Sequence, residues 1–292
     1  MELLKIRIPW PKKRSAKIFP IFLPNWGCPG RCVFCSQEAQ TGKRATSGDL
    51  DGILINCREA ISRRGEMVEL AFYGGTFTAI PAKARRKCLD FARAMRDAGM
   101  ISGFRCSTRP DKISEERARE LIGAGCGLIE FGVQSFNDGV LALSRRGCSG
   151  DAGRAALELC SGYGLAAGVH LMPGLPGSSA QIFLDDVRAA LELGANFLRL
   201  HPCLVLRGTD LERLWRRGEY APMEMEETLE VLAQALCLAT VKDVPVIRIG
   251  VAPEPDFEGA VLAGPRCPSL GSRVQGLAML MAVEKASGEA GA

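Results

Sequence analysis

Three cysteines lie close together in the segment Asn25-Trp26-Gly27-Cys28-Pro29-Gly30-Arg31-Cys32-Val33-Phe34-Cys35, which has the spacing C-x3-C-x2-C. The segment follows an apolar run over residues 18–24 that has the composition of a β-strand. Gly27 and Gly30 permit backbone conformations that point successive sulfur atoms inward. The sequence therefore predicts a loop after the first strand on which three thiolates can converge on one metal centre.

Further runs rich in β-branched and aromatic residues follow, and segments with helical periodicity separate them. These predicted strands cover residues 68–73, 103–108, 128–133, 166–171 and 197–206. The alternation predicts six βα units and a parallel sheet, which can form either a doubly wound open sheet or a complete or partial barrel. In both folds the functional loops gather at the carboxyl ends of the strands. The cysteine segment, the Gly74-Gly75 turn and the Pro/Gly-rich loop over residues 172–177 are therefore expected at one site.

The composition is that of an ordinary globular protein. The chain has 292 residues, of which 47% are hydrophobic and 24% are charged, and its net charge is +4. We expect a single domain over residues 1–292, with a core at about 18–250 that ends in a strand-like run at 244–249. A C-terminal extension at about 251–292 follows and holds a last helix near 270–285. Since no apolar run is long enough for a membrane helix and the first residues lack the apolar core of a signal peptide, we expect a cytoplasmic protein without membrane contact.

The remaining nine cysteines are far apart and mostly lie in apolar segments, so we expect them in the core. For the three clustered cysteines several readings stay open. A structural zinc site needs four ligands, and only His170 and His201 could complete it. A redox pair of Cys32 and Cys35 leaves Cys28 unexplained. A cubane [4Fe-4S] cluster with three cysteine ligands would keep one iron open for a substrate or cofactor.

The three-cysteine motif, with the aromatic Phe34 before its last cysteine, resembles that of the radical S-adenosylmethionine (SAM) enzymes. Further segments resemble one branch of them, the radical-SAM domain of the Elongator catalytic subunit and its bacterial relatives; they cover residues 72–78, 108–111, 130–135, 144–147, 170–176 and 204–209. The resemblance spans about residues 18–250. It implies an α/β fold, a partial (β/α)6 TIM-like barrel of the radical SAM type with a short C-terminal α/β extension.

The resemblance also implies a site. Cys28, Cys32 and Cys35 would bind a [4Fe-4S] cluster, and the amino and carboxylate groups of SAM would bind its fourth iron. Reductive cleavage of SAM would yield methionine and a 5′-deoxyadenosyl radical that takes a hydrogen atom from the substrate. Polar groups at the strand ends and the aromatic residue of the motif are expected to contact SAM. These residues are Phe34, Gly74, Gly75, Thr76, Arg109, Gln134 and Ser135.

The substrate is less defined. Coproporphyrinogen oxidases carry a further cysteine where this chain has Gln37, and methylthiotransferases need a second cluster. The Elongator subunit modifies tRNA and carries an acetyltransferase domain after the barrel, so acetyl transfer here would need a separate protein. A tRNA or other RNA substrate could contact Lys12-Lys13-Arg14 or Arg145-Arg146. Late-strand residues could line the substrate end of the barrel: His170, His201, Arg207 and Arg248.

Alternative functions remain at this stage. The chain could be a radical SAM enzyme for a small molecule, an iron–sulfur protein in electron transfer or regulation, or a zinc-stabilised barrel. The Gly74-Gly75 turn, Gln134 and the barrel pattern favour the radical enzyme, because an electron carrier needs no cavity. Such an enzyme would also need an electron donor such as flavodoxin or ferredoxin.

Overall fold

The central feature of the fold is a seven-stranded parallel sheet. The computed structural model describes residues 17–37, 49–251 and 255–290. The strands stand in the order β1-β2-β3-β4-β5-β6-β8, and every neighbouring pair is parallel. Their bounds are β1 Lys17–Phe22, β2 Val68–Tyr73, β3 Ile101–Thr108, β4 Cys126–Gln134, β5 Ala166–Leu171, β6 Phe197–Leu200 and β8 Val246–Ile249.

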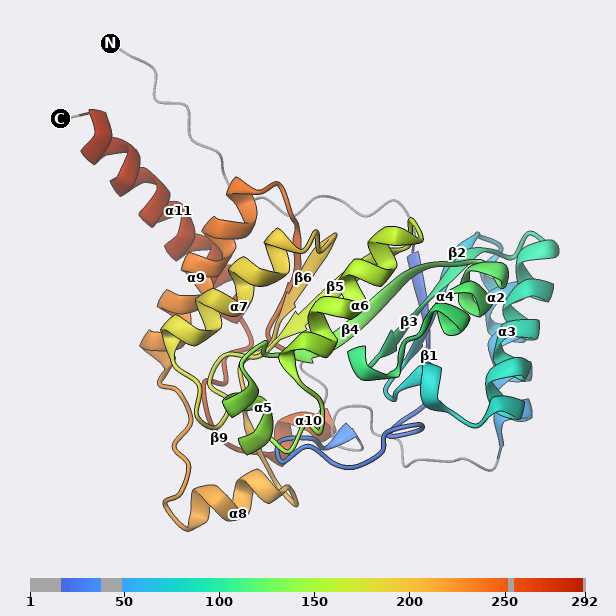
Figure 1. Ribbon diagram of the computed structural model, residues 1–292, viewed down its shortest axis with the longest axis horizontal. Coiled ribbons are helices and arrows are strands. Elements are labelled where there is room, and N and C mark those ends of the chain that lie inside the picture. Colours follow the sequence, from blue (N-terminus) through green and yellow to red (C-terminus); the bar gives the residue numbers. More distant parts are fainter. Residues whose placement is uncertain (1–16, 38–48, 252–254, 291–292) are drawn as a thin grey trace.

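The strand order decides between the two folds that the sequence allowed. A doubly wound sheet reverses its strand order in the middle, whereas a barrel adds each new strand beside the previous one. Here the order is sequential, and the sheet curls into an open half-barrel with its helices outside (Figure 1). The predicted partial barrel is therefore confirmed, with the strand-like run at 244–249 supplying β8 as a seventh strand.

Helices connect the strands and cover the outer face of the sheet. The larger ones are α2 Leu50–Arg64, α3 Ala82–Asp97, α4 Glu115–Gly123, α6 Gly150–Gly162, α7 Ala180–Glu192, α9 Met225–Val241 and α11 Leu270–Ala290. Short helices lie near the carboxyl ends of the strands (Figure 1); they are α5 Asp138–Leu143, α8 Asp210–Arg216 and α10 Pro255–Ala260. Ser114 caps α4 as its sequence predicts, because its hydroxyl accepts a hydrogen bond from the Arg117 amide at 3.3 Å. Among the described residues, no helix combines the length and apolar character needed to span a bilayer.

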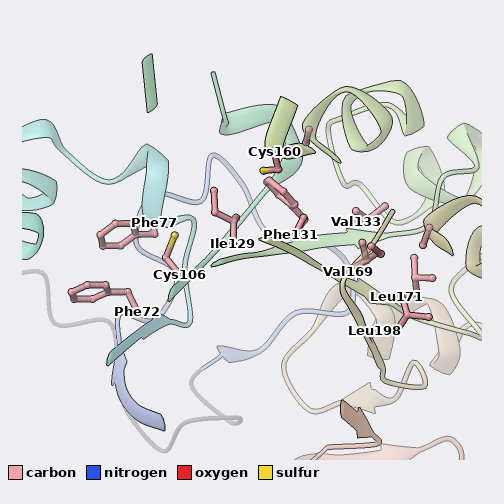
Figure 2. Packing of buried hydrophobic residues seen from close by; sticks show 14 of the residues in the cluster. Phe72, Phe77, Cys106, Ile129, Phe131, Val133, Cys160, Val169, Leu171 and Leu198 are labelled. Carbon is pink, nitrogen blue, oxygen red and sulfur yellow. The ribbon is translucent and has the colours of Figure 1, made fainter. Parts of the chain in front are cut away.

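The two faces of the sheet differ in chemistry because side chains alternate along each strand. The outward side chains are apolar and pack beneath the helices, as Figure 2 shows for Phe72, Phe131 and Leu198. The residues beside them in sequence, Tyr73, Glu130 and Arg199, line the concave side instead. Parallel strands are usually apolar on both faces. The polar concave face is therefore the unusual feature of this sheet.

Two sequence predictions need correction. The run at 197–206 is not one strand: β6 ends at Leu200, and β7 Val205–Leu206 pairs with β9 Val261–Ala263 in a separate antiparallel sheet. Pro202 lies at the break, where its ring removes a backbone donor that a continued ladder would need. Of the nine cysteines expected in the core, six are buried, whereas Cys148, Cys237 and Cys267 are partly exposed.

Candidate functional site

A cavity of about 710 Å³ fills the concave side of the half-barrel. Every strand of the sheet contributes to its wall, together with the cysteine segment at the carboxyl ends. Representative lining residues in strand order are Phe22, Tyr73, Ser107, Glu130, His170, Arg199 and Arg248. A volume of this size is typical of a site for a small organic ligand or cofactor.

The cysteine loop is held against two neighbouring segments by backbone hydrogen bonds. The Thr76 amide donates to the Trp26 carbonyl at 2.8 Å, and the Val33 amide donates to the Ser144 carbonyl at 3.1 Å. Gly27 has a φ of +77°, a left-handed conformation that glycine adopts without strain. A Cβ on Gly75 would overlap the Trp26 carbonyl and lie 2.7 Å from the Leu23 carbonyl oxygen. Both glycines are therefore needed for the close packing of the loop on the second strand.

The three clustered thiols share one end of the cavity. Cys28 Sγ lies 3.2 Å from Thr76 Oγ1, and Arg146 Nη1 donates to Cys32 Sγ at 3.6 Å. Burial, together with the neighbouring Cys32 and Cys28, raises the pKa of the Cys35 thiol to about 12. Within the described residues no three metal-binding side chains converge on a single ion. In a cubane cluster each cysteine binds a different iron, and three thiols that line one cavity supply three of the four ligands that such a cluster takes.

Most of the residues predicted to contact SAM line the cavity, namely Phe34, Gly74, Gly75, Thr76, Arg109 and Gln134. Gln134 ends β4 at a register shift and has a φ of +75°. Its Oε1 atom is buried and has no hydrogen-bond partner in the described structure. A buried acceptor in that state is expected to bind a ligand group.

Two predicted residues are already engaged within the protein. The guanidinium of Arg109 forms a two-bond pair with Asp111, at 2.8 and 3.1 Å, and donates to the Gly147 carbonyl at 3.1 Å. Ser135 does not line the cavity, because its hydroxyl donates to Asp186 Oδ2 at 2.6 Å on the helix side. Arg109 therefore lines the cavity with its guanidinium already paired, whereas Ser135 lies outside the lining.

The concave wall also holds a buried charge network that the sequence pattern did not predict. Glu130 pairs with Arg199 at 2.6 Å and with Arg105 at 3.5 Å, and it accepts a hydrogen bond from Tyr73 at 2.6 Å. Burial and the Glu130 charge raise the pKa of Tyr73, so its hydroxyl stays protonated and donates. The available signal was a charged residue between two apolar ones within a strand, as in Ile129-Glu130-Phe131 and Leu198-Arg199-Leu200.

Other candidate residues separate into lining and surface positions. His170 and His201 line the cavity with ring centroids 4.3 Å apart. Burial and nearby arginines lower the pKa of His170 to about 3, and burial with the His170 charge lowers that of His201. Arg248 also lines the cavity, whereas Arg207 is exposed outside it. Arg146 is buried in the wall, Arg145 is exposed, and the basic run at residues 12–14 lies outside the described residues.

Comparisons with known proteins agree with this architecture. Residues 24–190 match the sequence model of the radical SAM superfamily, and residues 195–277 match that of the radical SAM C-terminal domain. Similar proteins include the tRNA uridine(34) acetyltransferases of Methanocaldococcus infernus, 29% identical over 80% of this chain and 53% of the relative, and of Methanocaldococcus jannaschii, 27% identical over 80% and 52%. The chain thus spans about half the length of these relatives.

Solved structures show the same fold. The Elp3 protein of Methanocaldococcus infernus superposes with a TM-score of 0.67 at 24% identity, covering 89% of this chain and 62% of that one. Coproporphyrinogen III oxidase from Escherichia coli, a radical SAM enzyme, superposes with a TM-score of 0.58 at 19% identity, covering 81% and 54%.

Proposed function

The chain belongs to the radical SAM superfamily, whose enzymes use a [4Fe-4S] cluster and SAM, and from this premise we propose that Cys28, Cys32 and Cys35 hold the cluster at the carboxyl end of the half-barrel. The observation that carries the proposal is the position of the three thiols around one end of a cavity that all seven strands line. When bound, the cluster supplies the electron that cleaves SAM to methionine and a 5′-deoxyadenosyl radical. An electron carrier such as flavodoxin or ferredoxin is the proposed donor.

The chain's own residues would orient SAM beside the thiols. Arg146 is buried, and its hydrogen bonds among the described residues go to the Cys32 thiol and the Gly132 carbonyl, not to a carboxylate. Its Nη2 donates to the Gly132 carbonyl, which fixes the guanidinium at the cavity wall. We propose that it binds the SAM carboxylate together with Gln134, whose Oε1 lacks a partner. Phe34 and the Gly74–Thr76 backbone would complete this wall.

Arg109 and Ser135 would act indirectly in this proposal. Arg109 holds the Gly147 carbonyl, directly after Arg146, and thereby fixes the segment that carries the anion-binding guanidinium. The Ser135 oxygen accepts from the Asn137 amide at 3.0 Å and its hydroxyl donates to Asp186, so it fixes the chain just after Gln134. Both are therefore proposed as positioning residues.

We further propose that the substrate is an RNA nucleotide, since the relatives named above act on tRNA uridine. A nucleotide of an RNA must leave its stack of neighbouring bases to enter the cavity of about 710 Å³ on the concave side of the half-barrel. The competing reading, an iron–sulfur electron carrier, explains neither the cavity nor the buried polar wall. The small-molecule alternative differs from the RNA proposal only in the ligand that enters.

The test is anaerobic reconstitution followed by incubation with dithionite and SAM. We expect iron and sulfide in cluster proportions and release of 5′-deoxyadenosine, both of which Cys32→Ala should abolish. Cys148→Ala is the matched control, because this half-buried thiol lies near Arg146 and Arg109 but outside the motif. Unchanged product release by Cys32→Ala would refute the ligand assignment. Mass spectrometry of total tRNA against a small-molecule extract then identifies the substrate class.

A further inference from the structure

The cavity wall carries more positive than negative charge. Its charged lining residues are one carboxylate, Glu130, and four guanidinium groups, those of Arg109, Arg146, Arg199 and Arg248. Arg109 is neutralised by Asp111 and Arg199 by Glu130. Within the described ranges, Arg146 and Arg248 have no carboxylate partner. Arg146 is buried and Arg248 is solvent-exposed, so each guanidinium can bind an anionic group of a ligand, and the buried one needs such a partner to offset its desolvation.

The SAM proposal accounts for only one of these anions. Arg146 lies beside Cys32, at the thiol end, where the single carboxylate of SAM is proposed to bind. Arg248 lies on β8, the edge strand, three strand spacings from the β4 carbonyl that holds Arg146. At about 4.8 Å per spacing this is roughly 14 Å along the sheet. One carboxylate cannot contact both guanidinium groups, so an anion bound at Arg248 would be a different group from the SAM carboxylate.

The strand register places a second cation directly beside Arg248. Arg199 and Arg248 are paired across β6 and β8, and His170 is paired with Arg199 on the other side. Like charges directly opposite on neighbouring strands destabilise a sheet. Glu130 pairs with Arg199, and Arg105 has Glu69 as a further partner, so Arg248 is the member of the Arg199–Arg248 pair that lacks a carboxylate among the described residues. An anion bound between the two arginines would remove the repulsion.

Uncharged groups at the same place suit a nucleotide. The Nε2 atoms of His170 and His201 are buried without a hydrogen-bond partner in the described structure. Leu204, Val251 and Phe257 line the same cavity and provide apolar surface for a sugar or base. A free inorganic anion would use the cations alone, whereas a nucleotide would use the cations, the imidazoles and the apolar wall together.

We propose that Arg248, Arg199 and His201 form a phosphate subsite at the β8 edge of the barrel, which binds a phosphate group of the substrate. The inference rests on the proposed function for the nucleotide nature of that substrate. The phosphate can belong to an RNA backbone or to a small nucleotide, and both present the same oxygen atoms to the guanidinium groups.

The test compares Arg248→Gln with the cluster-loaded wild-type protein by titration with inorganic phosphate, uridine 5′-monophosphate, uridine and total tRNA. Arg248→Gln should lower the affinity for at least one phosphate-containing ligand tenfold or more, and Arg248→Lys should restore part of that affinity. An effect on tRNA alone identifies the RNA backbone as the source, with the slope of log K against log salt falling by about one. An effect on uridine 5′-monophosphate but not on tRNA identifies a small nucleotide. The control is Arg58→Gln, which removes one exposed arginine from α2.

The proposal is overturned if none of the phosphate ligands binds more weakly to Arg248→Gln, or if Arg58→Gln weakens them equally. Its failure is distinguishable from that of the proposed function. Release of 5′-deoxyadenosine by wild-type protein supports the radical chemistry whatever Arg248 does, and its absence removes that chemistry even if phosphate binds.

Discussion

The buried network around Glu130 makes a strong prediction about stability. Glu130→Gln keeps the shape of the side chain and an oxygen that accepts from Tyr73, but it removes the charge that faces Arg199 and Arg105. The Glu130, Arg199 and Arg105 side chains are only 7%, 18% and 12% exposed. Two opposite charges about 4 Å apart attract by about 4 kcal/mol at the effective dielectric of such sites. Breaking a buried pair costs about 3–5 kcal/mol, and cavity water screens this one, so we expect about 3 kcal/mol.

The assay is urea unfolding of the reduced, cluster-free chain, followed by far-UV circular dichroism. Asp185→Asn is the control, because its ion pair with Arg188 is exposed and its loss should change the unfolding free energy by about 0.5 kcal/mol or less. The double variant Glu130→Gln/Arg199→Gln should be less destabilised than the sum of the single variants, since it no longer leaves Arg199 without its main partner. A cost below about 1 kcal/mol for Glu130→Gln, or strict additivity in the double variant, would refute this reasoning.

Two further predictions concern the loop packing and the pH dependence. Gly75→Ala should lower the iron content of reconstituted protein severalfold, because its Cβ would displace the cysteine loop; Gly30→Ala, where the added Cβ meets nothing within 4 Å, should keep the iron content, and equal loading of both variants would contradict the packing argument. Burial raises the pKa of Asp186 to about 6, although hydrogen bonds from Ser135 and Phe136 lower it. The folded chain therefore holds this proton more tightly than the unfolded chain, so its contribution to stability is fully present below about pH 4 and is lost as the pH rises through 6. Relative to Asp186→Asn, the wild-type protein should lose up to about 3 kcal/mol of unfolding free energy between pH 4 and 7, measured by urea unfolding at each pH, and parallel profiles would contradict this.

The fold was largely predictable because its strands are short apolar runs between clear turns. The runs at 68–73 and 166–171 coincide with β2 and β5. Ser114 was predictable as a cap from the acidic residues that follow it. The break after β6 was not foreseen, although Pro202 stood in the run, because apolar residues continue on both sides of it. Composition identifies strand-like segments, but it does not show which partner each segment finds.

The site was predictable in its residue types and less so in their partners. Arg109 and Asp111 lie two residues apart, and the sequence does not show that the guanidinium is occupied by its neighbour. Ser135 was expected beside Gln134 in the cavity. Side chains alternate along β4, with Glu130, Gly132 and Gln134 lining the cavity, so Ser135 points to the helix side, where it contacts Asp186. Such contacts depend on residues about 50 positions apart, which local periodicity does not encode.

The alternation along the strands also explains why one face of this sheet carries the chemistry. A parallel sheet is most stable when both faces are apolar, and each buried charge on the concave face opposes folding unless it is paired. Glu130 satisfies Arg199 in the protein itself, while the thiol end and the β8 end keep guanidinium groups without carboxylate partners in the described structure. The guanidinium groups without carboxylate partners therefore stand at the two ends of the cavity, with Arg146 buried and Arg248 exposed, and the paired charges lie between them. This arrangement suits a protein that binds a cofactor at one end and an anionic ligand at the other, because a ligand at the thiol end offsets the desolvation of Arg146 and a ligand at the β8 end meets a solvent-accessible guanidinium.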